Sequence, residues 1–73
     1  MGKAIVGQFS RSLKRLRVKR GLSQQELAEL ADLEYKHIQR LESRKPCDVK
    51  LTTLDKLAKA FKISLSKLLI FDK

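Results

Sequence analysis

The sequence predicts an all-α fold of five short helices, because two kinds of signal recur along its 73 residues. Apolar residues repeat at intervals of three and four, which is the spacing of one face of an α-helix. Residues that favour helix ends, such as Ser and Gly, stand beside these repeats. So short a chain is expected to form one domain. No disulfide framework is expected to support its core, because Cys47 is the only cysteine.

The first predicted helix carries one apolar stripe among basic residues. Phe9, Leu13 and Leu16 lie four and three residues apart, which places them on the same face. Gly21 is expected to end the helix, because Gly readily takes the left-handed conformation found after many helices. Residues 1–8 are assigned to a separate N-terminal segment, and the domain is placed at residues 9–71.

The second predicted helix, at about residues 23–31, has the clearest start signal in the chain. Ser23 is a favourable N-cap, and Glu26, three residues later, completes a capping box. The buried face of this helix is expected to carry Leu27, Ala28 and Ala31.

A short turn leads to the third predicted helix, at residues 34–43. Ile38 and Leu41 are expected to face the core, since they lie three residues apart. The opposite face is dense in hydrogen-bond donors. It carries Tyr35, Lys36, Gln39 and Arg40.

Residues 44–50 include Pro46 and are predicted to form a loop. The fourth helix follows this loop, and Thr52 with Asp55 resembles a capping box at its start. Its buried stripe is expected to comprise Leu54, Leu57, Ala58 and Phe61.

A fifth helix is predicted from Leu65 to Phe71, with Ser64 as its N-cap. It holds more large apolar residues than one side of a small core readily covers. We therefore expect a two-fold dimer interface at Leu65, Leu68, Leu69, Ile70 and Phe71. The alternative is that Leu65, Leu68 and Leu69 complete the core of the monomer.

The formal net charge is +9, and it is unevenly distributed. Residues 1–20 hold seven basic side chains and no acidic one, whereas residues 21–35 hold four acids and no Lys or Arg. Such clustering is typical of a nucleic-acid-binding surface. The same pattern also suits a helical protein with strongly charged, solvated faces.

Three motifs carry a family resemblance. The runs LSQQELA at residues 22–28, IQRLE at residues 38–42 and LDKLAKAF at residues 54–61 resemble the phage-repressor and Cro (XRE) family of helix-turn-helix domains. The resemblance covers about residues 9–70, and the chain is most similar to stand-alone members such as controller proteins of restriction-modification systems. It implies a lambda-repressor-like fold. The implied function is transcription regulation by sequence-specific binding, as a homodimer, to an inverted repeat in double-stranded DNA.

The resemblance also implies a set of DNA-binding residues. The two motif helices would be residues 23–31 and 34–43, with the second in the major groove. Arg and Lys donate to guanine and Gln pairs with adenine, whereas other contacts hold the backbone. Tyr35, Lys36 and Arg40 would meet base edges beside Gln39, Gln24 would reach a phosphate or a base, and Arg44 and Lys45 would hold the backbone. The alternative is that these are solvated surface residues.

Arg17 and Glu42 occupy positions that often form an ion pair in this family, so the resemblance implies a structural support for the third helix. The competing interpretation is that Arg17 contacts a phosphate.

Two residues depart from the family pattern. Asp32 stands in the turn where the family usually has Gly, and Asp tolerates the left-handed conformation better than most residues. Glu34 replaces a small hydroxyl residue at the start of the third helix. Its carboxylate either repels phosphate or accepts from cytosine N4.

The sequence offers little support for other chemistry. His37 and Cys47 are the only candidate soft metal ligands, and neither has companions at zinc-site spacing. We expect no metal, cofactor, small-molecule ligand or membrane span. We also expect no enzyme activity, because no nucleophile-base pair is evident. The expected location is the cytoplasm of a bacterium or of a phage host, in association with the nucleoid.

Two other functions remain open. A protein-binding adaptor or antitoxin-like module would use the same fold, with the apolar C-terminal helix as its docking surface. A membrane-surface peptide would use basic amphipathic helices. Five capped helices with compatible apolar stripes favour a globular domain over that second possibility.

Overall fold

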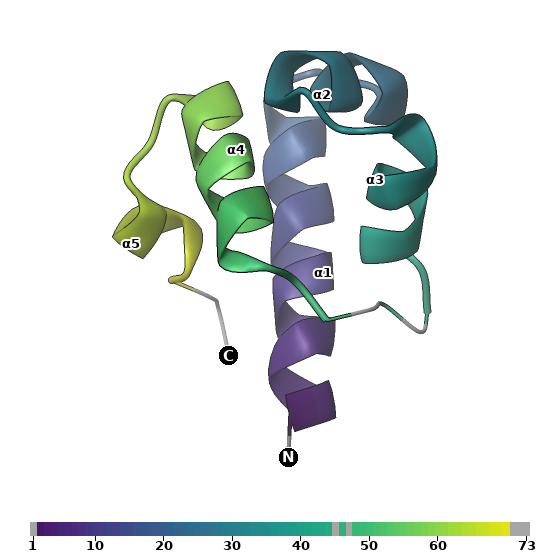
Figure 1. The fold of residues 1–73 in the computed structure, drawn as a ribbon, viewed down its shortest axis with the longest axis vertical. Coiled ribbons are helices and arrows are strands. Elements are labelled where there is room, and N and C mark those ends of the chain that lie inside the picture. Colours follow the sequence, from purple (N-terminus) through teal and green to yellow (C-terminus); the bar gives the residue numbers. More distant parts are fainter. Residues whose placement is uncertain (1, 45, 47, 71–73) are drawn as a thin grey trace.

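The computed structural model describes residues 2–44, 46 and 48–70 and confirms the predicted all-α fold of five helices. The helices are α1 (Gly2–Lys19), α2 (Gln24–Ala31), α3 (Tyr35–Leu41), α4 (Leu51–Phe61) and α5 (Leu65–Leu68). Figure 1 shows α1 running through the middle of the molecule, with α2 across its upper end, α3 on one side of it and α4 and α5 on the other. The long first helix is therefore the element against which the others are placed.

The position between residues 8 and 9, where the sequence places the start of the domain, falls inside α1. The helix begins at Gly2 and runs without interruption through Phe9. Ile5 and Val6 lie four and three residues before Phe9, so the apolar stripe of the helix extends backwards by one turn. All three residues line the same groove.

The start of α2 has the predicted capping box. The Ser23 hydroxyl accepts from the Glu26 backbone N–H at 3.0 Å, and the Glu26 carboxylate accepts from the Ser23 N–H at 2.8 Å. Gly21 has a φ of 70°, the left-handed conformation expected after α1. These local signals determine where the chain turns between the two helices.

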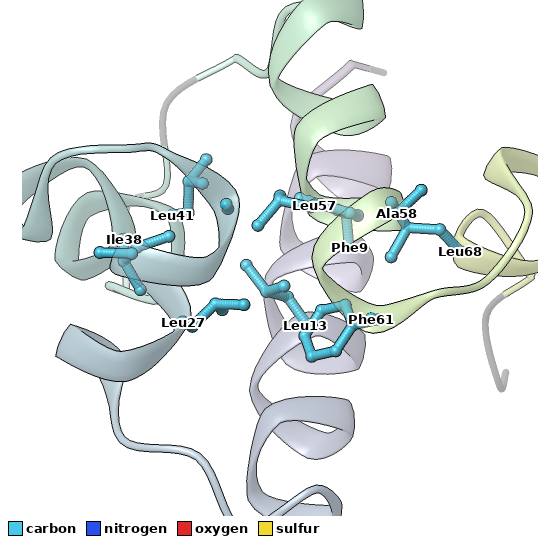
Figure 2. Packing of buried hydrophobic residues seen from close by; sticks show 11 residues of the cluster. Phe9, Leu13, Leu27, Ile38, Leu41, Leu57, Ala58, Phe61 and Leu68 are labelled. Atoms are coloured by element: carbon cyan, nitrogen blue, oxygen red, sulfur yellow. The ribbon is translucent and has the colours of Figure 1, made fainter.

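The core is formed by side chains from all five helices, which meet beside α1 (Figure 2). Phe61, Leu13, Leu27, Ile38, Leu41 and Leu57 are its largest fully buried side chains. Nearly every residue predicted to face inward is buried. Leu16 and Leu54 are exceptions, because they are only partly buried and pack against the edge of the core.

The capping box predicted for Thr52 and Asp55 is absent. Because α4 begins at Leu51, Thr52 lies inside its first turn, and the N-cap is Lys50, with no side-chain cap. The Asp55 carboxylate instead pairs with Lys59 one turn later, at 3.1 Å.

The fifth helix has the predicted cap but is shorter than expected. The Ser64 hydroxyl accepts from the Lys67 backbone N–H at 3.1 Å. The helix ends at Leu68, and the Ile70 N–H donates to the Lys67 carbonyl three residues back, which tightens the chain beyond α-helical spacing. Phe71 lies outside the described residues. In the described part of the chain, no helix is long and apolar enough to cross a membrane.

The capping box of α2 should make the free energy of unfolding depend on pH. Hydrogen bonds from the Ser23 backbone N–H, and secondarily from its hydroxyl, lower the pKa of Glu26. The folded protein therefore binds fewer protons than the unfolded chain near that pKa. This contribution is present above the ordinary Glu pKa of roughly 4.3 and is lost as the pH falls through the lowered value.

Glu26→Gln keeps an acceptor for the Ser23 N–H but does not titrate. The stability advantage of the wild type over this variant should shrink between about pH 6 and about pH 3. Denaturant unfolding of both proteins at a series of pH values measures this difference in the free energy of unfolding. A difference that stays constant over this range would contradict the prediction.

Candidate nucleic-acid interface

The turn between α2 and α3 is built around Asp32. This residue has a φ of 56°, and its backbone N–H donates to the carbonyls of Ala28 and Glu29 at the end of α2. Leu33 N–H closes the turn on the Ala28 carbonyl at 2.9 Å, and the Lys56 ammonium lies 3.4 Å from the Asp32 carbonyl. Asp therefore takes the left-handed conformation at the position where the resemblance expects Gly.

Arg17 and Glu42 form a bidentate ion pair between α1 and the end of α3. Arg17 Nε donates to Glu42 Oε2 at 2.8 Å, and Arg17 Nη2 donates to Glu42 Oε1 at 2.9 Å. Arg17 Nη1 donates to the Leu22 carbonyl at 2.7 Å. The bonds to Glu42 raise the pKa of Arg17 above its ordinary value. With all three guanidinium nitrogens donating within the protein, the geometry favours the structural role of Arg17 over a phosphate contact.

Gln24 belongs to the same network. Its Nε2 donates to Glu42 Oε1 at 3.1 Å, so the first residue of α2 is joined to the C-cap residue of α3. The side chain is half-buried. No sequence pattern predicts this hydrogen bond, because it joins two polar residues that are eighteen positions apart.

The outer face of α3 carries the donors that the sequence places there. Ile38 and Leu41 are fully buried, and this determines which side of the helix faces solvent. The exposed residues are Tyr35, Lys36, Gln39 and Arg40. Arg44 is exposed just beyond the helix, and Lys45 lies outside the described residues. Glu34 is the N-cap residue of α3, but its carboxylate makes no capping hydrogen bond.

Arg20 has a structural role that the sequence did not reveal. Its Nη1 donates to the Phe61 carbonyl at 2.9 Å, and its guanidinium lies 5.8 Å from the centre of the Phe61 ring. Arg20 thereby binds the C-terminal end of α4. Two of the basic residues near the start of the chain, Arg17 and Arg20, are thus engaged in holding helices together.

The residues predicted for a dimer interface divide into two groups. Leu68 is only 3% exposed and belongs to the core, and Leu65 packs against it. Leu69 and Ile70 are 41% and 71% exposed. Leu69 also lines an apolar groove of about 300 Å³ together with Ile5, Val6 and Phe9 of α1.

His37 is half-buried on α3, and Cys47 lies outside the described residues. Within the described ranges, no three His, Cys, Asp or Glu side chains are grouped closely enough to hold a metal ion.

Comparisons with known proteins agree with this geometry. The family model for the Cro/C1-type helix-turn-helix DNA-binding domain matches residues 12–73. The crystal structure of the restriction-modification controller protein C.AhdI from Aeromonas hydrophila has a TM-score of 0.82 and 35% identity, covering 89% of this chain and 97% of that one. The chain belongs to the family of Cro/C1-type helix-turn-helix DNA-binding domains.

Other solved structures share the fold. NHTF, a hypothetical transcription factor from Neisseria, has a TM-score of 0.82 and 27% identity, covering 92% of this chain and 76% of that one. The controller protein C.Esp1396I, bound to a 19-base-pair DNA duplex, has a TM-score of 0.76 and 22% identity, covering 90% of this chain and 96% of that one. No curated protein sequence matches the chain.

Removing Arg17 should destabilise the protein strongly. Arg17→Met leaves the Glu42 carboxylate, whose side chain is 2% exposed, with Gln24 as its remaining partner. We expect a loss of about 3–5 kcal/mol in the free energy of unfolding, because an uncompensated charge is left buried. The double variant Arg17→Met/Glu42→Gln should recover part of this loss, since it removes the charge.

Denaturant unfolding of Arg17→Met, Glu42→Gln and the double variant gives the coupling energy of the pair. Arg11→Met is the matched control, because Arg11 is exposed on the same helix. It should change stability by about 0.5 kcal/mol or less. Equal losses from the variants at Arg17 and Arg11 would be inconsistent with a supporting role for the ion pair.

Proposed function

We propose that this protein is a transcription regulator that binds double-stranded DNA sequence-specifically, with α3 in the major groove. The main support is the two-sided character of α3. Its inner side is held by Ile38, Leu41 and the ion pair at Glu42, while its outer side presents four polar or basic side chains. A rigidly placed helix with exposed donors suits the reading of base edges. Such a regulator acts where DNA is found, in the bacterial cytoplasm.

The chemistry of the exposed residues assigns their roles in this proposal. Arg40 and Lys36 are donors for guanine O6 and N7, and Gln39 matches adenine. Tyr35, at the first turn of α3, contacts base edges beside them. Arg44, just beyond the helix, contacts the phosphate backbone, as does Lys45, which lies outside the described residues. Gln24 is half-buried and its side-chain Nε2 donates to Glu42 Oε1, so the atom proposed to contact DNA is its side-chain carbonyl oxygen.

The first test separates base contacts from backbone contacts. Bound fragments selected from random DNA define the operator, and anisotropy titrations compare operator with scrambled duplexes. Arg40→Ala should weaken operator binding by roughly 1–3 kcal/mol and relax preference at one position. Arg44→Ala should weaken both duplexes alike and reduce the salt slope by about 1.

Two outcomes count against this assignment. If both variants change the ratio of operator to scrambled binding equally, the roles of Arg40 and Arg44 are wrong. If the wild type binds no DNA at low salt while a protein partner co-purifies with it, the adaptor or antitoxin-like function is favoured instead.

We propose further that the protein binds its operator as a two-fold dimer. Leu69 and Ile70 remain exposed after the core is complete, and Leu69 continues into the apolar groove beside Ile5. A second copy of the chain is the occupant proposed for this surface, with Phe71 as a further contact outside the described residues. A symmetric pair places two α3 helices on an inverted repeat, roughly 34–36 Å apart.

Sedimentation of the free protein tests the dimer. Leu69→Asp should shift the wild-type dimer to monomer, because burying a carboxylate at an apolar interface is costly. Leu30→Asp is the matched control, since Leu30 is 58% exposed on α2, away from α5. A wild type that remains monomeric at roughly tens of micromolar, a range in which specific dimers form, would disprove the proposal.

A further inference from the structure

A cleft of about 360 Å³ lies beside the end of α3, between the middle of α1 and the segment that follows α3. Arg11 and Lys14 of α1 line one side of it. Ser43, Arg44 and Pro46 line the other side, with Glu42 also at its edge. The cleft therefore adjoins the helix that the proposed function places in the major groove.

The cleft is strongly cationic. Among the described residues that line it, three basic side chains accompany one carboxylate, that of Glu42, which accepts two hydrogen bonds from Arg17. Within the described part of the chain, Arg11, Lys14 and Arg44 form no ion pair. All three are exposed. The positive charge of the cleft thus has no counter-charge within the described residues.

The two sides of the cleft are held together by the ion pair at its inner end. Arg11, Lys14 and Arg17 follow one another at intervals of three residues, so they lie along one face of α1. Arg17 binds the C-cap residue of α3, which brings this face of α1 up to the start of the loop. Arg11 and Lys14 are thereby placed in line with Arg44, the first basic residue beyond α3.

We propose that this cleft binds backbone phosphate of the operator, just outside the base pairs that α3 reads. The inference rests on the proposed function and extends its binding surface onto α1. Arg and Lys are the residues that bind phosphate oxygens, and three of them line this cleft beside the end of α3. Arg11 and Lys14 position the protein on the duplex and do not read its sequence.

The salt dependence of operator binding tests the proposal. The variant Arg11→Gln/Lys14→Gln should reduce the log-log salt slope by about 0.9 for each phosphate that it no longer neutralises. It should leave the ratio of operator to scrambled affinity unchanged. Arg11→Gln alone should give about half of the slope change, and provides a second measurement if the double variant folds poorly.

The matched control removes the same charge elsewhere. Lys59→Gln/Lys62→Gln changes two exposed lysines at the end of α4 that do not line this cleft. Its slope should equal that of the wild type. Duplexes with trimmed flanks provide a second readout: the wild type should lose affinity when the outer phosphates are removed, and the Arg11/Lys14 variant should lose much less.

The outcomes distinguish the cleft from the proposed function. A wild type without DNA binding overturns the proposed function itself. A wild type that binds its operator, with equal slopes for the cleft variant, the control and the wild type, overturns only the cleft. A cleft variant that loses operator preference also overturns it, because Arg11 and Lys14 would then act through the placement of α3.

Discussion

The bidentate contact between Arg17 and Glu42 sets the geometry on which the rest of the interface depends. Glu42 is the C-cap residue of α3, so fixing its carboxylate fixes one end of that helix against α1. The same guanidinium binds the Leu22 carbonyl before α2, and Gln24 of α2 donates to the same carboxylate. A buried ion pair adds little net stability against its desolvation cost, whereas its directional hydrogen bonds hold both motif helices in one orientation.

The basic residues accordingly fall into two functional groups. Arg17 and Arg20 bind a carboxylate and a backbone carbonyl inside the fold, so part of the net charge of +9 supports the packing of the helices. Arg40 and Arg44 are exposed on or beside α3. The net charge therefore overstates the number of phosphate contacts, and the salt slope is the quantity that counts them.

The fold was predictable where the signal is local. Ser23 with Glu26 marks the start of α2, and the spacing of Ile38 and Leu41 orients α3, because caps and helical faces depend on neighbouring residues. The Thr52 pattern did not predict the true start of α4, because the helix begins two residues earlier, at Leu51, so that Thr52 lies inside its first turn. The hydrogen bond from Arg20 to Phe61 was missed because its partners are 41 residues apart, a relation that one sequence does not contain.

The last helix joins the stability of the domain to the proposed association. A chain of this size buries only roughly 60% of the surface that its unfolded form exposes, so each core residue matters. Leu68 completes that core, while Leu69, the next residue, faces outward. A partner that covers Leu69 would hold α5 against the rest of the protomer and so secure Leu68 as well. In the dimer that we propose, association and the packing of α5 therefore stabilise each other, and loss of either weakens both.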